Sequence, residues 1–125
     1  MSTSTVTVNA LILWTRQTRR VAAFYRLIGL PLEDEDHGDG HAHQACDIAG
    51  VHVAVYDADT ATSAPRRREG GALQIGFKVP SLELVANLLR EAEEYRELVG
   101  RQKMDWGVRV VVEDPDGRPV ELTEA

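Results

Sequence analysis

The sequence predicts an α+β protein in which one strand–helix–strands unit occurs twice. Two stripes of apolar residues have the i, i+3, i+4, i+7 spacing of a helix that buries one face. The second stripe repeats the first at an offset of 64, and the two consist of Val21, Phe24, Tyr25 and Ile28 and of Val85, Leu88, Leu89 and Ala92. A short apolar run precedes each stripe, and several such runs follow it. The repeat therefore predicts two half-domains joined around one cleft, where a binding site is expected.

The first half begins with a strand, because residues 6–14 are rich in Val, Leu and Ile. The helix over the first stripe follows it directly. Thr15 and Thr18 offer hydroxyl groups that could cap the beginning of this helix. Gly29 lies where the end of a helix favours a residue with positive φ.

The rest of the first half is predicted to be three strands. A proline after the helix prevents its continuation, so residues 30–35 can form the first of them. Residues 36–40 have the composition of a turn, and strands are expected at 42–48 and 51–56. Residues 58–71 are polar and end in two glycines, which is typical of a linker between the halves.

The second half repeats this order. Residues 73–79 form its first strand, and Ser81 caps a helix that is expected to end near Glu94. Three further strands, the first of them irregular, are predicted at 95–105, 108–113 and 119–123.

Charge and cysteine content exclude several functions. The net charge of −6 argues against nucleic acid and against an anionic membrane surface as partners. Cys46 is alone, so the chain forms no internal disulfide and suits a reducing compartment. The beginning of the chain has no basic segment, and no apolar run is long enough to span a membrane. We therefore expect a cytoplasmic protein.

Two segments resemble a known family. Residues 22–30 (AAFYRLIGL) are similar to the first-helix signature of the vicinal oxygen chelate superfamily, and residues 114–122 (DPDGRPVEL) are similar to its closing hairpin. Trp106-Gly107 also fits, and the resemblance covers nearly the whole chain. This superfamily includes glyoxalase I, extradiol dioxygenases, methylmalonyl-CoA epimerase and the bleomycin-resistance proteins.

The resemblance implies a fold and an assembly. The fold would be two βαβββ modules that form a curved mixed sheet around a cavity, with the helices on the outer face. One glyoxalase/bleomycin-resistance-like domain would cover residues 1–125, with module one at about 6–57 and module two at about 72–125. Members of the family are usually homodimers, so we expect a homodimer here.

The resemblance also implies where a metal would bind. Metal-using members place ligands on the first and last strands of each module, which correspond here to Ala10, Ala54, Gln74 and Glu121. Two alanines cannot ligate a metal, and one carboxylate with one amide falls short of the three ligands that a catalytic ion needs. We therefore expect no metal and no other cofactor. The alternative is a divalent ion bound by Glu121 and Gln74 with a recruited ligand such as His52.

Three histidines lie close together in the sequence. His37, His41 and His43 could form a surface metal site, but a solvated hairpin turn is the favoured interpretation. His52 is in phase with Ala54 on a predicted strand, where it could titrate inside the cavity or serve as a hydrogen-bonded wall residue.

Aromatic and charged side chains complete the candidate site. The aromatic candidates could stack on a planar or cationic ligand, or could simply pack in the core. Glu121 could contact a ligand or be held by Arg109 or Gln74. The expected ligand-binding residues are Trp14, His52, Tyr56, Gln74, Trp106, Arg109 and Glu121; catalytic residues, if any, are not identified.

Three functions remain open from the sequence. The first is a metal-free protein that binds a small molecule, similar to the bleomycin-resistance proteins. The second is a metal-dependent lyase, isomerase or dioxygenase of the same superfamily, which would use Glu121. The third is a non-catalytic module that uses the fold only for assembly. Whether the protein is an enzyme therefore stays open, as does the identity of its ligand.

Overall fold

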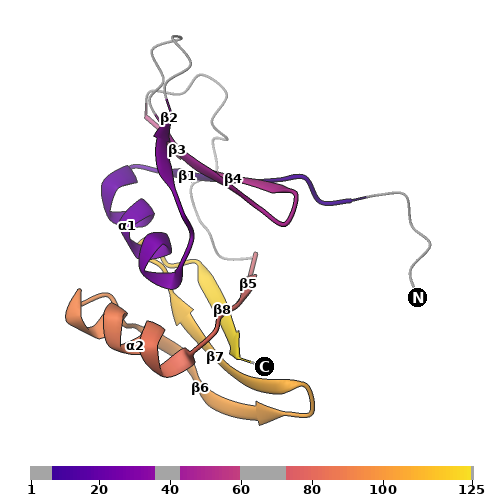
Figure 1. Cartoon of the computed structure of the whole chain (residues 1–125). Helices are drawn as coiled ribbons and strands as arrows, with labels where there is room; N and C mark the ends of the chain where they lie inside the picture. The colour runs from indigo at the N-terminus through magenta and orange to yellow at the C-terminus, as the bar shows by residue number, and fades with distance from the viewer. Residues whose placement is uncertain (1–6, 36–42, 60–72, 125) are drawn as a thin grey trace.

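A computed structural model describes residues 7–35, 43–59 and 73–124 of the chain (Figure 1). Its helices and strands are, in order, β1 (Ala10–Thr15), α1 (Thr18–Ile28), β2 (Glu33–Glu35), β3 (His43–Ile48), β4 (Val51–Asp57), β5 (Ile75–Lys78), α2 (Leu82–Glu91), β6 (Glu97–Met104), β7 (Gly107–Glu113) and β8 (Pro119–Glu124). The predicted order of one strand, one helix and three strands therefore occurs twice. Most of the expected linker, residues 60–71, lies outside the described residues, as do His37 and His41.

Each module forms its own four-stranded mixed sheet. The strand order is β1-β4-β3-β2 in sheet A and β5-β8-β7-β6 in sheet B. In both sheets the first strand of the module pairs in parallel with the last one, and the other pairs are antiparallel. The expected α+β class with two βαβββ modules is confirmed. The two sheets remain separate and do not close into one.

The ends of the helices show what local sequence can determine. Gly29 ends α1 with φ +122°, and Ser81 accepts a hydrogen bond from the Leu84 N–H at the start of α2, as predicted. The N-cap of α1 is Gln17, whose side chain makes no capping bond. Helix α2 ends before the predicted Glu94, because Glu93 adopts a left-handed φ of +58° although it has a side chain.

Both helices lie on one side of the molecule and pack against each other (Figure 1). Their buried stripes and the helix-facing residues of both sheets form one hydrophobic cluster that spans the two modules. Phe77 from β5 is partly buried and packs against this cluster, where its ring lies 6.0 Å from that of Tyr25 in α1. Neither helix of the described chain is long and apolar enough to cross a membrane.

The turn after β7 anchors module two to α1. The buried carboxylate of Asp114 accepts hydrogen bonds from the Tyr25 hydroxyl at 2.7 Å and from the Arg118 guanidinium at 2.9 Å. It also accepts from the backbone N–H groups of Asp116 and Arg118, both at 2.9 Å. Burial, together with the negative charge of Asp114, raises the pKa of Tyr25 far above its ordinary value.

The second face of each sheet points away from the helices. We call these the open face of module one and the open face of module two. Strand alternation and register place the following residues on the open face of module one: Ala10, Ile12, Trp14, Glu33, Glu35, His43, Ala45, Asp47, His52, Ala54 and Tyr56. Neither α1 nor α2 packs on this face, which leaves it as the first place to look for a site.

Candidate functional site

Four side chains form a continuous row across the open face of module one, one from each strand. Glu35 on β2 lies 2.8 Å from the Nε2 atom of His43 on β3. The imidazole of His43 stacks on the ring of Tyr56 on β4, with centroids 4.2 Å apart and planes inclined by only 12°. Tyr56 in turn lies 5.1 Å from Trp14 on β1 at an angle of 37°. We call these four residues the aromatic row.

The register of the sheet explains this row. Glu35 is directly opposite His43, and Trp14 is directly opposite Tyr56. His43 and Tyr56 lie one step beyond the Gln44↔Val55 pair of the β3–β4 ladder. Side chains directly opposite one another on neighbouring strands are close enough for ring contacts. Because β1 is an edge strand, Trp14 is the last member of the row, and it is only partly buried.

Small side chains lie beside the aromatic row. The next position along the strands is occupied by Ala45 and Ala54, with Ile12 at the edge. Ile12 is 36% exposed. The rings of the aromatic row therefore stand higher above the sheet than their neighbours, and an apolar edge adjoins Trp14.

A second carboxylate–imidazole pair lies on the same face. Asp47 and His52 are opposite each other on β3 and β4, and their side chains are 3.0 Å apart. The side chain of His52 is 39% exposed, whereas that of His43 is 1% exposed. The two histidines of this face therefore differ sharply in their access to solvent.

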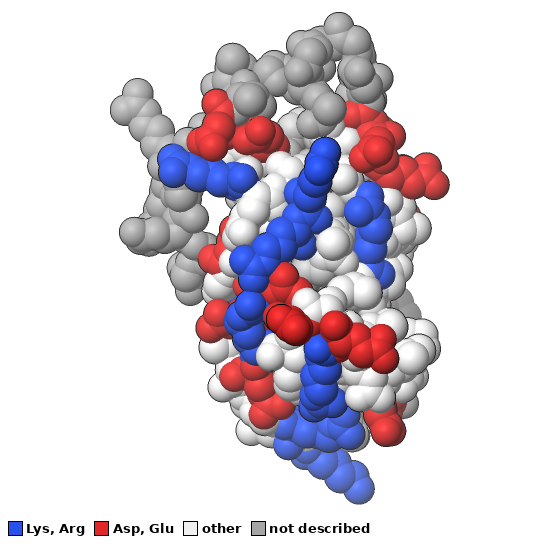
Figure 2. Space-filling model, turned by 90° about the vertical axis from the view of Figure 1, so that its left-hand side faces the viewer, with Lys and Arg blue, Asp and Glu red and all other residues white. Residues whose placement is uncertain are grey.

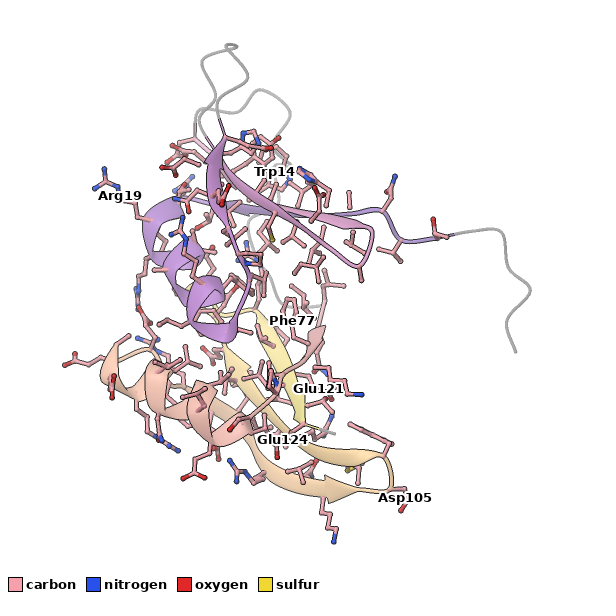
Figure 3. All side chains as sticks on the ribbon, in the orientation of Figure 1. Trp14, Arg19, Phe77, Asp105, Glu121 and Glu124 are labelled. Carbon is pink, nitrogen blue, oxygen red and sulfur yellow. The ribbon has the colours of Figure 1, made fainter. Side chains whose placement is uncertain are left out.

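The open face of module one is acidic. Its described strand residues include three carboxylates, from Glu33, Glu35 and Asp47, and neither Lys nor Arg. Arginine is instead frequent on the side of the molecule that carries the helices. Figure 2 shows this side, with Lys and Arg side chains spread among several acidic ones. Arg19, for example, points outward from α1 (Figure 3). This distribution favours a cation over an anion on the open face.

The open face of module two is built around an ion pair. Glu121 on β8 and Arg109 on β7 are 2.5 Å apart, and the guanidinium of Arg109 also donates to Gln102 at 2.9 Å. Gly76 on β5 is opposite Glu121, and a Cβ atom there would lie 3.5 Å from the second carboxylate oxygen. Glu121 is thus held by Arg109, which is one of the two interpretations that the sequence left open.

The residues at the four positions where metal-using members of the family place ligands do not fit a metal ion. Ile12 is opposite Ala54 and Gly76 is opposite Glu121, so Ala54 and Glu121 occupy equivalent places in the two modules. Ala10 and Ala54 contribute only methyl groups, Gln74 is exposed, and the carboxylate of Glu121 already pairs with Arg109. Among the described residues, no three His, Cys, Asp or Glu side chains converge as metal ligands do.

The predicted ligand-binding residues fall into two groups. Trp14, His52 and Tyr56 lie on the open face of module one, whereas the others belong to module two, namely Gln74, Trp106, Arg109 and Glu121. Trp106 is in the β6–β7 turn and is 54% exposed, so it is not a core residue. Figure 3 shows Trp14 and Glu121 on different sheets. No hydrogen bond, ion pair or ring contact between described residues joins the side chains of the two groups.

Sequence reasoning missed Glu35 and His43. His43 was grouped with His37 and His41 in a solvated hairpin, but it is buried and paired with Glu35. The turn between the two strands could have revealed the position of His43. If Ile48 and Val51 pair across the Ala49-Gly50 turn, counting back along both strands places His43 opposite Tyr56.

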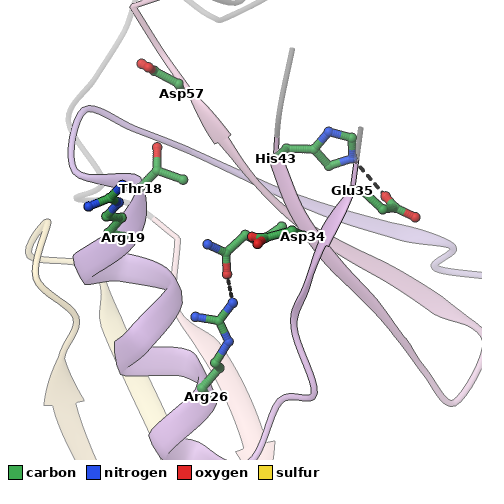
Figure 4. Close-up of a pocket in the computed structure, with 8 residues that line it drawn as sticks. Thr18, Arg19, Arg26, Asp34, Glu35, His43 and Asp57 are labelled. Carbon is green, nitrogen blue, oxygen red and sulfur yellow. Dashed lines mark hydrogen bonds and ion pairs between the residues drawn. The ribbon is translucent and has the colours of Figure 1, made fainter. Parts of the chain in front are cut away.

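A hollow of about 770 Å³ is lined by residues of α1 and of strands β2, β3 and β4, and two of them, Glu35 and His43, also belong to the aromatic row (Figure 4). Its walls carry both signs of charge, and the guanidinium of Arg26 is already bonded to the Gln44 side chain and to the Leu32 carbonyl. The residues that line it are Thr18, Arg19, Arg26, Asp34, Glu35, His43, Gln44 and Asp57. The aromatic row offers a more specific arrangement than this mixed surface, and we take it as the candidate site.

Comparisons with a protein family and with solved structures agree with this fold. The model of a family described as Glyoxalase/Bleomycin resistance protein/Dioxygenase superfamily matches residues 7–122. No curated protein sequence matches the chain. Similar solved structures include a glyoxalase-related enzyme from Fulvimarina pelagi, with a TM-score of 0.71 at 18% identity over 95% of this chain and 88% of the other. A glyoxylase/bleomycin resistance protein/dioxygenase domain from Frankia sp. EAN1pec has a TM-score of 0.68 at 18% identity over 98% and 93%.

Proposed function

This chain belongs to the Glyoxalase/Bleomycin resistance protein/Dioxygenase superfamily, and from that premise we propose that it binds a planar organic cation without a metal. The ligand would lie against the indole of Trp14 and extend the aromatic row beyond the edge of sheet A. The observation that carries this proposal is the position of Trp14, a partly exposed tryptophan whose ring is tilted against Tyr56 at the end of a row of three rings. A flat ligand would bury apolar surface there at little cost in side-chain freedom.

Charge supports a cation rather than a neutral molecule. Trp14 offers the aromatic face to which cations are most strongly attracted. Three carboxylates share its face of the sheet, and no Lys or Arg of the described strands opposes them. An organic anion of the same shape would meet a repulsive surface.

A homodimer would add the residues of module two. Both sheets have an open face, and exposed apolar side chains such as Ile12, Met104 and Trp106 are the kind that a partner covers. In this proposal the second copy presents Arg109 and Glu121 to the ligand, so that the two groups of predicted residues form one site. Sedimentation analysis of the mass in solution tests the dimer.

Three indole compounds of similar shape test the ligand class. Tryptamine is a cation, tryptophol is neutral and indole-3-propionate is an anion, so calorimetry on the metal-free protein compares charge at nearly constant shape. We expect tryptamine to bind most tightly and Trp14→Leu to weaken it roughly tenfold, since a cation–π contact contributes about 0.5–2 kcal/mol. Equal binding of the three compounds, or unchanged binding in Trp14→Leu, would contradict the proposal.

A pair of charge variants provides the matched control. Glu33→Gln removes a carboxylate from the open face of module one, and Glu83→Gln removes one from the first turn of α2. Both side chains are exposed, and both changes alter the net charge equally. Glu33→Gln should weaken tryptamine roughly twofold to threefold and Glu83→Gln should not, because the attraction is screened over about 10 Å.

A further inference from the structure

Arg118 of module two holds the backbone of Trp14 in module one. Its Nη2 atom donates to the Trp14 carbonyl oxygen at 2.6 Å. Its Nη1 atom donates to the buried carboxylate of Asp114 at 2.9 Å and to the carboxylate of Asp116 at 3.2 Å. The Arg118 side chain is only 12% exposed. It therefore joins the buried centre of the turn after β7 to the strand that carries the partly exposed end of the aromatic row.

The place of Trp14 on β1 explains why its carbonyl takes this donor. In the parallel pairing of β1 with β4, the carbonyl oxygens of Asn9 and Thr15 accept from the N–H groups of His52 and Ala58. Backbone groups alternate between the two sides of a strand, so those of Trp14 point away from β4. Strand β1 is an edge strand, and no other strand of the described sheets pairs with that side. The guanidinium therefore takes the place of a neighbouring strand at this position.

A second contact holds the chain just beyond Trp14. The side-chain amide of Gln17, between β1 and α1, donates to the Pro115 carbonyl at 2.9 Å and to the Asp116 carboxylate at 2.6 Å. The same turn of module two thus binds module one at Trp14 and again at Gln17. The end of β1 is therefore placed by module two as well as by its own sheet.

We propose that Arg118 is a positioning residue for the Trp14 end of the aromatic row. Its two contacts fix the end of β1 against module two, so that the indole of Trp14 keeps its position beside Tyr56. A side chain that binds a ligand needs a supporting shell that locks its geometry. The effect of Arg118 on a ligand rests on the proposed function, whereas its hold on Trp14 does not. Arg118 acts through the Trp14 backbone and does not contact the ligand.

Charge and position predict opposite effects of removing this arginine. Loss of a positive charge by itself strengthens the binding of a cation such as tryptamine, whereas loss of the hold on Trp14 weakens it. Arg20 of α1 provides the matched control, because it also bonds across the modules, to Glu94 at 2.6 and 3.0 Å. Its remaining side-chain hydrogen bond among the described residues goes to Gln17 and not to β1. Arg118→Gln and Arg20→Gln change the net charge equally.

Fluorescence of Trp14 tests the hold without any ligand. The chain has two tryptophans, so a Trp106→Phe background leaves Trp14 as the only one. In that background Arg118→Gln should increase acrylamide quenching of Trp14 roughly twofold, because an edge strand that loses its anchor opens locally and exposes the indole. Arg20→Gln should leave the quenching unchanged. Equal quenching with and without Arg118→Gln would overturn the inference.

Calorimetry with tryptamine tests the effect on binding, in chains that retain Trp106. The affinity should fall roughly threefold to tenfold in Arg118→Gln, which is within the range by which residues without ligand contact alter binding. Arg20→Gln should bind tryptamine at least as tightly as the wild type. An affinity that is unchanged or raised in Arg118→Gln, or that falls equally in both variants, would overturn the inference.

A lysine variant separates position from stability. Arg118→Gln leaves the buried Asp114 carboxylate without its cation, so circular dichroism first establishes whether that variant folds. Arg118→Lys keeps the charge beside Asp114, but a single ammonium lacks the planar fork that reaches both this carboxylate and the Trp14 carbonyl. Its urea midpoint should lie near that of the wild type, while quenching rises and the affinity for tryptamine falls. If quenching and affinity in Arg118→Lys also match the wild type, the inference is overturned.

The positioning role and the proposed function fail in different ways. Increased quenching in Arg118→Gln, without binding of any indole probe by the wild type, would overturn the proposed function and support the hold on Trp14. Binding of tryptamine by the wild type, with the same affinity in folded Arg118→Gln, would overturn the positioning role and support the proposed function.

Discussion

Replacing Asp114 by Asn should destabilise the protein by about 3 kcal/mol. The substitution keeps the size of the side chain and an oxygen that can accept from the two backbone N–H groups of the turn. It places an NH₂ group where the second carboxylate oxygen accepted from the Tyr25 hydroxyl and the Arg118 guanidinium. A hydrogen bond to a charged group contributes about 1.5–3 kcal/mol, and removing one partner of a buried ion pair costs about 3–5 kcal/mol. Asp116 and the Trp14 carbonyl still accept from Arg118, which places the expected loss at the lower end.

Urea unfolding followed by circular dichroism measures this loss. The midpoint should fall while the slope stays constant, because the native surface area is unchanged. Asp116→Asn is the matched control: its carboxylate also pairs with Arg118, at 3.2 Å, but its side chain is 19% exposed and keeps an oxygen that can accept from Gln17, so this change should cost less than Asp114→Asn. The reasoning is refuted if Asp114→Asn loses no more stability than Asp116→Asn.

Three further predictions concern titration, metal content and a helix end. The pKa of Tyr25 is raised in the folded state, mainly by burial, so the unfolded chain loses this proton at lower pH than the folded one. The free energy of unfolding should therefore decline above about pH 10, and the urea midpoint of Tyr25→Phe should decline less over that range. Tag-free wild type and Glu121→Ala are soaked with zinc, nickel, manganese or iron(II), desalted, and analysed for metal by mass spectrometry. The wild type should retain no ion that depends on Glu121, because this carboxylate pairs with Arg109. One ion per chain that is lost in Glu121→Ala would favour the enzyme alternative. Gly29→Ala should lower stability by about 1 kcal/mol, because φ is +122° although no atom would contact the new Cβ; an unchanged thermal midpoint would contradict this.

The sequence predicted those parts of the fold that depend on local patterns. The two apolar stripes specify the helices, and the Ala49-Gly50 turn specifies the β3–β4 pairing and so the face on which His52, Ala54 and Tyr56 lie. The early end of α2 was not predictable, because Glu93 adopts a left-handed conformation without being a glycine.

The candidate site was predicted only in part. Trp14 and Tyr56 share a face because of simple alternation along their strands, and the sequence showed this. The contribution of Glu35 depends on β2, a strand of three acidic residues that has no apolar pattern to reveal its register. The division of the predicted residues between two open faces depends on how the modules pack, which no local pattern encodes.

The parallel pairing of first and last strands has a consequence for synthesis on the ribosome. Neither β1 nor β5 can find its partner until the final strand of its own module has been made. Module one can complete its sheet while the chain is still growing, but β5 must wait for β8, which ends at Glu124. Since both modules share one hydrophobic cluster, the whole domain stays incomplete until β8 has been made. A chain released before β8 would leave β5 without its only partner strand in the described sheet, and an unpaired strand edge favours aggregation.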